Sequence, residues 1–294
     1  METLKEVLAR YGFNFKKSFG QNFLTDADLL ASIVKGADCA GETVLEIGAG
    51  AGALTRELAK EAKRVISFEI DRSLQPILGE ILSDKKNVSL YFEDILKRKT
   101  EAIESLIGED YLVVANLPYY ITTPLIMRFV EESTRCKRLV VMVQEEVADR
   151  LVAREGTPAY GAVTVAVNVA GRAEKLRRVP RELFTPRPNV DSAVVRIEID
   201  RGRFRVPDRA LLRAAVRAGF NNRRKTLCNN LMQSFSLSRA EAEALLDDCG
   251  IAPGGRLCRT GRAPCPKKRR FVGFRRALSP GGLLRLRRMN ALLL

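Results

Sequence analysis

The stretch Thr43-Val-Leu-Glu-Ile-Gly-Ala-Gly-Ala-Gly52 decides the fold of this chain. Its first half, residues 43–47, is mainly apolar and predicts a buried strand. Glycines at alternate positions follow, and residues 53–62 are then expected to form a helix. Glycines let a backbone approach a ligand closely, and a helix N-terminus offers free N–H groups. A strand, a glycine loop and a helix in this order therefore indicate a site for a nucleotide-like ligand.

The same alternation of strand and helix continues along the chain. Further strands are predicted at 65–68, 88–92, 111–115 and 139–143, and further helices at 27–35, 73–82, 100–107, 124–132 and 144–154. Because the strands are apolar and separated by helices, they should form a parallel sheet with helices on both faces. Residues 162–169 are apolar and β-branched, and their pattern fits a helix or a strand equally well.

Acidic and amide side chains follow successive strands of this predicted sheet. Glu69 ends the second strand, Asp94 follows the third and Asn116 follows the fourth. The carboxyl ends of parallel strands meet at one edge of a sheet, and ligands bind along that edge. An acid about 20 residues beyond a glycine loop is the usual partner of a ribose diol, which is the role that we predict for Glu69.

The four residues Asn116-Leu-Pro-Tyr119 stand where the fourth predicted strand ends. They offer an amide side chain, backbone carbonyls and an aromatic face. The amide oxygen and the carbonyl of Leu117 or Pro118 can accept from an exocyclic amine, while the Tyr119 ring stacks on a nucleobase. The alternative is a strand-to-helix turn in which Pro118 and Tyr119 serve only to turn and to pack.

A proline-rich loop, Phe184-Thr-Pro-Arg-Pro-Asn-Val-Asp191, leads into another predicted strand. Prolines restrict the backbone and hold such a loop extended, which would present Phe184 to a cleft. Equally, the loop is a connector that places Phe184 in the core. The sequence leaves both interpretations open.

The composition excludes whole classes of chemistry. No histidine occurs among the 294 residues, so there is no Ser-His-Asp triad, histidine base or histidine metal ligand. The six cysteines form no C-x-x-C pair, so no metal centre is predicted, and free thiols fit a reducing cytoplasm. No apolar run reaches the roughly 18 residues of a membrane span, and no secretory signal is visible. We therefore expect a cytoplasmic protein that is not embedded in a membrane.

The net charge of +15 is spread unevenly. No Asp or Glu occurs between Cys249 and Leu294, and twelve Lys and Arg follow Gly254. A basic protein suggests a polyanionic partner. Residues 207–250 have helical spacing and carry the basic cluster Asn222-Arg-Arg-Lys-Thr226. This cluster is either a solvated helix face or a phosphate contact.

The first 25 residues are basic and aromatic without a clean period. This composition predicts an arm or lid rather than a strand. The alternative is an N-terminal segment that packs on the core.

The glycine loop alone fits a dinucleotide as well as S-adenosylmethionine. Glu46 precedes the first glycine by two positions, where the ammonium of the methionine moiety would lie. Asp94 is placed to contact the adenine amine of the cofactor, and the Asn116 loop supplies a methyl acceptor site. These features favour S-adenosylmethionine. An NAD-dependent oxidoreductase would also need an acid or base at the hydride site, and none is found without histidine.

Seven motifs occur in order between about residues 16 and 252. They are Phe19-Gly-Gln-Asn-Phe-Leu24, Glu46-Ile-Gly-Ala-Gly50, Glu69-Ile-Asp71, Asn116-Leu-Pro-Tyr119, Gln144-Glu-Glu-Val147, Phe184-Thr-Pro-Arg-Pro-Asn-Val-Asp-Ser-Ala-Val194 and Arg223-Arg-Lys-Thr226. Together they resemble the ribosomal RNA adenine N6-dimethyltransferases, which act on two adjacent adenosines near the 3′ end of small-subunit rRNA. The resemblance implies an α/β fold, with the Rossmann-like sheet of class I S-adenosylmethionine-dependent methyltransferases and a small C-terminal all-helical domain. A non-catalytic nucleic-acid-binding relative shares that fold, but the intact motifs argue against lost catalysis.

The resemblance also implies roles for individual residues. The cofactor would be bound by Gln21, Asn22, Leu24, Glu46, Gly48, Gly50, Glu69, Asp94 and Asn116. The acceptor adenine would be held by Asn116, Leu117, Pro118, Tyr119 and Phe184, with Tyr119 and Phe184 on its two faces. RNA would be contacted by Lys16, Lys17, Arg223, Arg224 and Lys225. The implied partner is small-subunit rRNA in a pre-ribosomal particle, bound by a monomer without a metal ion.

Four segments follow from this comparison. They are an arm (1–25), a methyltransferase domain (26–200), a helical RNA-contacting domain (201–254) and a basic tail (255–294). The tail departs from the family pattern after Pro253. Acid-free sequence rich in Arg, Gly and Pro is typical of translation in a shifted frame, so we predict a frameshift near codons 252–258 and poor order beyond about residue 255. The alternative is a genuine basic tail that binds RNA.

Overall fold

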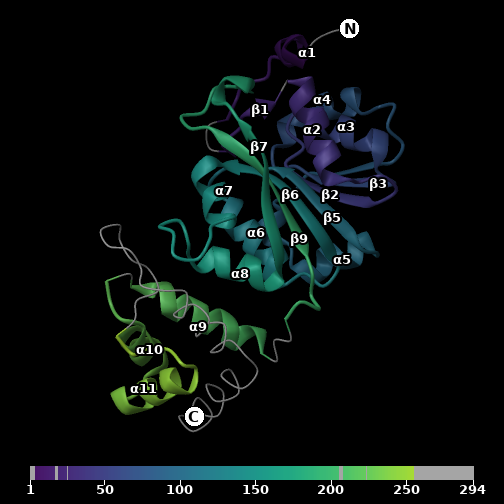
Figure 1. Cartoon of the computed structure of the whole chain (residues 1–294). Coiled ribbons are helices and arrows are strands. Elements are labelled where there is room, and N and C mark those ends of the chain that lie inside the picture. Colours follow the sequence, from purple (N-terminus) through teal and green to yellow (C-terminus); the bar gives the residue numbers. More distant parts are fainter. Residues whose placement is uncertain (1–3, 17–18, 25, 205–207, 223, 255–294) are drawn as a thin grey trace. The chain divides into compact units, whose positions relative to one another are not determined.

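The computed structural model of the chain describes residues 4–16, 19–24, 26–204, 208–222 and 224–254 (Figure 1). The chain divides into two compact units, the first formed by 1–152 with 171–200 and the second by 153–170 with 201–294. Residues 153–170 therefore belong with the helical unit, whereas the sequence placed them in the methyltransferase domain. The predicted tail, 255–294, lies outside the described residues.

The first unit is built on a mixed sheet. Its strands lie in the order β4 (Val88–Tyr91), β3 (Arg64–Phe68), β2 (Thr43–Ile47), β5 (Tyr111–Asn116), β6 (Cys136–Gln144), β9 (Ser192–Ile199) and β7 (Gly171–Val179). The strands from β4 to β6 pair in parallel, as predicted. The chain leaves β4 at one edge and returns beside β2 as β5, so the strand order reverses between β2 and β5. Ligands in α/β sheets bind outside the strand ends at such a reversal.

Strands β9 and β7 extend the sheet beyond the five strands that were predicted to be parallel. Each pairs antiparallel to its neighbour. Strand β7 was not predicted at all, because five of its nine residues are charged. It lies at the sheet edge, where charged side chains stay in water and obscure the period-2 pattern of a strand. A register shift between Lys175 and Arg177 breaks the alternation further.

Helices cover both faces of the sheet (Figure 1). On one face, α2 (Ala27–Ala37) and α3 (Ala53–Glu61) pack against side chains of β2 and β5. On the other face, the ring of Tyr111 in β5 meets Phe129 of α6 (Thr122–Glu131) edge-on, with centroids 6.4 Å apart. The other helices of this unit are α1 (Leu4–Arg10), α4 (Gln75–Ile81), α5 (Thr100–Ile107) and α7 (Glu145–Leu151), with short 3₁₀ turns at 72–74, 95–97 and 181–183.

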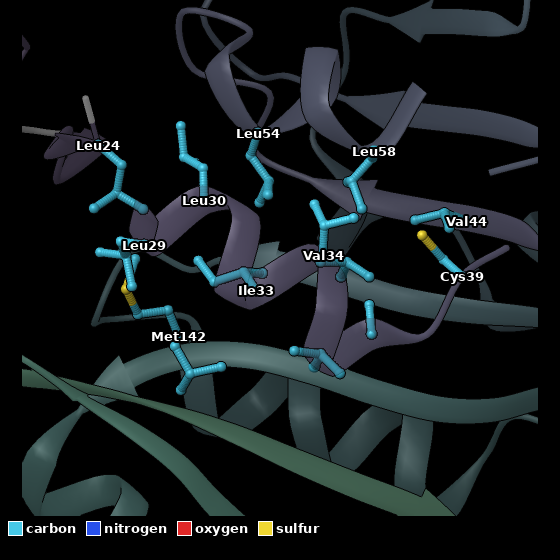
Figure 2. Close-up of a cluster of buried hydrophobic side chains, with 14 of the residues drawn as sticks. Leu24, Leu29, Leu30, Ile33, Val34, Cys39, Val44, Leu54, Leu58 and Met142 are labelled. Carbon is cyan, nitrogen blue, oxygen red and sulfur yellow. The ribbon is translucent and has the colours of Figure 1, made fainter. Parts of the chain in front are cut away.

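Helix α2 illustrates how the sequence sets this packing. The side chain of Asp26 accepts from the Leu29 N–H at 2.7 Å and so caps the helix N-terminus. The buried residues of α2 recur at helical spacing and are Leu29, Leu30, Ile33, Val34 and Ala37. They share a core cluster with residues of α3 and the sheet, which include Leu54, Leu58, Val44 and Met142 (Figure 2).

A second, two-stranded sheet joins the N-terminal arm to the proline-rich loop. Strand β1 (Phe23–Leu24) pairs antiparallel with β8 (Phe184–Thr185), with Phe23 opposite Thr185 and Leu24 opposite Phe184. The arm therefore packs on the body of the first unit. Its helix α1 was not predicted from the sequence.

The second unit is helical in its described residues. It contains α8 (Ala162–Ala170), α9 (Arg209–Asn221), α10 (Leu227–Phe235) and α11 (Arg239–Asp248). The segment that the sequence left undecided is therefore a helix, and Val165 shares a core with Leu212, Leu231 and Leu245. A capping box opens α11, in which the Ser238 hydroxyl accepts from the Glu241 N–H at 3.3 Å and Glu241 Oε2 accepts from the Ser238 N–H at 2.8 Å.

Candidate active site

A cavity opens at the carboxyl edge of the sheet, where the strand order reverses. Among the residues predicted to bind a cofactor or an acceptor, it is lined by Gln21, Asn22, Gly48, Gly50, Glu69, Asp94, Asn116, Leu117, Pro118, Tyr119 and Phe184. Leu24 and Glu46 do not line it. Elements far apart in the sequence thus supply one site, as the alternating strands predicted.

The glycine loop after β2 forms one wall. The N–H of Gly48 donates to the Phe68 carbonyl at 2.8 Å, and its φ of 82° lies in the left-handed region that favours glycine. Next to it, the N–H of Gly50 donates to Glu69 Oε2 at 2.8 Å. The glycine loop, which leads into α3, is therefore held directly by Glu69 at the end of β3.

Glu69 is only 6% exposed and lines the cavity. Burial raises the pKa of its carboxyl, although hydrogen bonds from the Asp71 and Gly50 N–H groups oppose this shift. The Asp71 N–H donates to Oε1 at 2.8 Å. Each carboxylate oxygen can accept more than one hydrogen bond, so Glu69 retains the capacity to bind ligand hydroxyls.

The turn after β4 forms the adjoining wall. Asp94 Oδ1 accepts from the Leu96 N–H at 2.9 Å and so shapes the turn. Ile70 and Leu96 line the cavity and are 41% and 43% exposed, although both are apolar. The sequence analysis missed them, but each follows an acid of the cavity within two positions. Exposed apolar side chains in a cavity suit the faces of a flat ring.

The Asn116 amide is oriented by the arm. Its Nδ2 donates to the Asn22 carbonyl at 3.1 Å. An amide has one donor end and one acceptor end, so Oδ1 is left to accept from a ligand.

The two carbonyls that the sequence left as alternatives differ in their surroundings. The Pro118 carbonyl already accepts from the Ile121 N–H and the Thr122 hydroxyl, each at 3.1 Å. No donor reaches the Leu117 carbonyl from within the part of the chain that the structure describes. Leu117 is therefore the better second acceptor for an amine.

Two residues predicted to hold an acceptor, Tyr119 and Phe184, bring aromatic side chains to the cavity. The Tyr119 hydroxyl lies 2.9 Å from the Ser192 hydroxyl, and burial raises the pKa of Tyr119. Phe184 is 4% exposed and belongs to the main core cluster while it also lines the cavity. Both interpretations of Phe184 therefore hold at once. Phe19 and Tyr120 also line the cavity and were not predicted as site residues.

Glu46 lies elsewhere than the sequence analysis expected. It is fully buried within β2, opposite Ser67 of β3, and Oε2 accepts from the Thr55 and Ser67 hydroxyls at 2.6 Å each. Burial raises the pKa of Glu46 to about 7. The Glu46 side chain points into the interior and not into the cavity. The expected contact with a ligand ammonium therefore has no support from this geometry. Leu24 is likewise part of the core.

The residues predicted to contact RNA are spread over both units. Lys16 Nζ contacts Asp71 Oδ1 at 2.5 Å, so its charge is engaged within the first unit. Arg224 and Lys225 are exposed in the helical unit, where Lys225 Nζ donates to Gln233 at 3.1 Å. Lys17 and Arg223 lie outside the described residues.

Two features are absent from the described residues. No group of three or more Cys, Asp or Glu stands close enough together in them to hold a metal ion. None of their helices is both long and apolar enough to cross a membrane.

Comparisons with known proteins show the family of this chain. The family model for ribosomal RNA adenine dimethylase matches residues 12–257. The ribosomal RNA small subunit methyltransferases A of Geobacillus thermodenitrificans (strain NG80-2) and Anoxybacillus flavithermus (strain DSM 21510 / WK1) are 48% and 45% identical to the chain over 257 residues. These matches cover 85% of this chain and 88% and 87% of the relatives.

Solved structures show the same fold. The 23S rRNA methyltransferase ErmE is 27% identical, with a TM-score of 0.63 over 92% of this chain and 100% of that one. A dimethyladenosine transferase from Plasmodium falciparum, 23% identical, has a TM-score of 0.66 over 90% and 95% of the two chains. The predicted class I methyltransferase fold is thereby confirmed. Since the family match spans most of its length, the chain belongs to the ribosomal RNA adenine dimethylase family.

Proposed function

We propose that this chain transfers methyl groups from S-adenosylmethionine to N6 of two adjacent adenosines near the 3′ end of small-subunit rRNA. One observation carries the proposal: Asn116, Tyr119 and Phe184 line the same cavity as the glycine loop and Glu69. An amine acceptor site and a nucleotide-type site thus share one space. The names of the small-subunit relatives support the choice of RNA.

The donor set of the cavity fits the cofactor. Glu69 offers carboxylate oxygens to a ribose diol, and Asp94 suits an adenine amine. Ile70 and Leu96 offer apolar contacts to the purine. We therefore propose Gln21, Asn22, Gly48, Gly50, Glu69, Asp94 and Asn116 as the cofactor residues, without Leu24 and Glu46.

The bound cofactor supplies a methyl group on a sulfonium, already activated toward a nucleophile. The chain's own residues prepare the amine that receives it. An aryl amine is a poor nucleophile because its lone pair is delocalised into the ring. Asn116 Oδ1 and the Leu117 carbonyl accept its N–H groups and draw them out of the ring plane, which localises the lone pair. Tyr119 and Phe184 hold the ring between them.

This chemistry needs little proton management. The amine proton becomes acidic only once the methyl group is received, so water can take it. A chain without histidine can therefore perform the reaction. For the second transfer, the spent cofactor would be exchanged for fresh S-adenosylmethionine, and the methylated amine turns to present its one remaining N–H to one of the two acceptors.

The partner in this proposal is small-subunit rRNA within a pre-ribosomal particle, bound by a monomer in the cytoplasm. Exposed cations of the helical unit, Arg224 and Lys225, would contact its phosphates, as would Arg223 and Lys17. Removing one such cation should weaken binding and reduce the salt dependence of the affinity.

Transfer of radiolabelled methyl groups to immature small ribosomal subunits tests the function, with dimethyladenosine identified by mass spectrometry. Asn116→Ala should reduce the rate by about a hundredfold or more, because it removes an acceptor aimed at the reacting amine. Asn189→Ala, an exposed position outside the cavity, is the matched control and should behave as wild type. Absence of label with the wild-type protein would mean a binding protein or another enzyme class. Full activity in Asn116→Ala would overturn the mechanism.

We further propose that the tail arises from a frameshift near codons 252–258. The family match ends at residue 257, which supports this position. Resequencing the gene across these codons tests it. An unbroken frame with the same tail in related strains would favour a genuine RNA-binding tail instead.

A further inference from the structure

Asp71 is a buried carboxylate just behind the cavity. It is 1% exposed and is not part of the cavity lining. Both of its oxygens bind the N-terminal arm: Oδ1 accepts from Lys16 Nζ at 2.5 Å and Oδ2 accepts from Gln21 Nε2 at 2.7 Å. The Lys16 N–H donates to Gln21 Oε1 at 2.8 Å, which closes the group. We call Lys16, Gln21 and Asp71 the arm anchor.

The arm anchor differs from the other ion pair of the arm. Burial alone would raise the pKa of Asp71, but hydrogen bonds from Lys16, Ser73 and Gln21 outweigh it and lower the pKa. Arg10 and Glu80 also form an ion pair, yet their side chains are 46% and 43% exposed. In the arm anchor only the acidic partner is buried, since the Lys16 side chain is 42% exposed and that of Asp71 is 1% exposed. Exposed pairs are screened by water and contribute little, whereas removing Lys16 or Gln21 leaves the buried Asp71 carboxylate short of a donor. Of these two polar contacts, the one at Asp71 therefore holds the arm more firmly, beside the arm's apolar packing and the β1–β8 pairing.

The three residues after Gln21 each touch a different part of the site. The Asn22 carbonyl accepts from Asn116 Nδ2 at 3.1 Å. The Phe23 ring packs so closely on Gly50 that a Cβ there would lie 3.3 Å from it. Leu24 pairs with Phe184 in the β1–β8 sheet. A shift of residues 22–24 would therefore displace the glycine loop, the Asn116 amide and Phe184 together.

The contact at Asn116 has a direct chemical consequence. While Asn22 receives Nδ2, the amide presents its oxygen to an incoming amine. If the Asn22 carbonyl moved away, the amide would be free to turn and present its own N–H groups. Those groups cannot accept from an amine, so the acceptor would be lost without any change in Asn116 itself.

We propose that Asp71 is a positioning residue for methyl transfer: through Lys16 and Gln21 it fixes the Asn22 carbonyl that orients Asn116. This inference rests on the proposed role of Asn116 in holding the acceptor amine. It also reassigns Lys16, which the sequence analysis placed on RNA, to the arm anchor.

Single-turnover methyl transfer at saturating cofactor tests the proposal in the full chain. Asp71→Asn should lower the rate constant at least about tenfold, since small displacements of reacting groups have effects of this size or larger. Lys16→Met acts from the arm side without altering the turn at Asp71, and should lower it as well. Affinity for the ribosomal substrate and its salt dependence should stay at wild-type values for Lys16→Met.

Glu80→Gln is the matched control, because it breaks the exposed ion pair of the same arm. Its rate constant and thermal unfolding should match wild type. Lys16→Arg, which keeps the charge, should recover most of the activity lost in Lys16→Met. The double variant Lys16→Met/Asp71→Asn should lose no more than the worse single variant, because both act through one contact.

Each outcome supports or overturns the positioning role of Asp71. Wild-type rate constants in Asp71→Asn and Lys16→Met, measured alongside an inactive Asn116→Ala, would overturn the positioning role and leave the proposed function intact. Additive losses in the double variant would overturn it too, as would weaker RNA binding with an unchanged rate constant in Lys16→Met. An inactive wild type, by contrast, would mean that the proposed function itself has failed. Should Asp71→Asn not fold, Lys16→Met carries the same test.

Discussion

The ring of Tyr119 is tethered at its far end. Its hydroxyl lies 2.9 Å from the hydroxyl of Ser192, which is fully buried at the start of β9. The loop that contains Tyr119, directly after β5, is thereby tied to β9, two positions away in the sheet. This tie sets the plane of the ring that, in our proposal, stacks on the target base.

Ser192→Ala should lower kcat/KM for the RNA substrate by about fivefold, because a single hydrogen bond contributes about 1 kcal/mol. Tyr119→Phe removes the same contact from the other side and should have the same effect. The variant that combines both changes should be no worse than either one. Steady-state methylation assays measure all three. Losses that multiply in the double variant would show that the two hydroxyls act separately.

Among single residues, the sequence predicted side chains that the structure brings to one cavity, while their chemical roles stay predictions. Asn116, Tyr119 and Phe184 line the cavity as expected. The choice between the Leu117 and Pro118 carbonyls stayed open, because it depends on backbone hydrogen bonds that a sequence does not display. Glu46 lies outside the cavity lining, since spacing from a glycine does not determine which face of a strand a side chain leaves.

Helix α6 is hydrogen-bonded to the turn that follows β4. Its Arg128 donates from Nη1 to the Ile95 carbonyl at 2.8 Å, from Nε to the Thr100 hydroxyl at 2.9 Å, and from Nη2 to the Arg98 carbonyl. Helix α6 begins at Thr122, shortly after Asn116-Leu-Pro-Tyr119. One guanidinium thus connects that helix to the turn holding Asp94 and Leu96.

Arg128→Lys should raise KM for S-adenosylmethionine by about tenfold, because an ammonium cannot reproduce the planar fork that spans three acceptors. The rate at saturating cofactor should change much less. Arg150→Lys, in the exposed i,i+4 pair with Glu146, is the control. The prediction fails if KM for the cofactor stays at its wild-type value while the rate falls.

Elements were predictable where one pattern dominated. The strand and helix around residues 43–62 formed as expected, because an apolar strand, glycines and a helix leave no competing arrangement. Strand β7 was missed because its edge position allows charged side chains, and helix α1 because seven residues show too little periodicity. Residues 162–169 needed their packing partners before helix α8 could be assigned.

For the molecule as a whole, Glu46 is a carboxyl enclosed between β2, β3 and α3. Its pKa is raised from 4.5 to about 7 by burial. Between these two pH values the folded protein keeps a proton that the unfolded chain has lost. This stabilisation is therefore fully present below about pH 4.5 and is lost as the pH rises through about 7.

Glu46→Gln should flatten the dependence of the unfolding free energy on pH in this window. The wild type should lose up to about 3 kcal/mol more than the variant between the two limits, at about 1.4 kcal/mol per unit of pKa. Urea denaturation across a pH series measures the difference. A Glu46→Gln curve parallel to that of the wild type would contradict the raised pKa.

The pairing of β1 with β8 has a consequence during synthesis of the protein on the ribosome. Phe23 leaves a ribosome early, yet its partner Thr185 is added about 160 residues later, which at 5–20 residues per second is roughly 8–30 s. Until then β1 lacks its partner strand, and Phe184 is missing from the cavity lining. The cavity is therefore complete only once almost the whole first unit has been synthesised.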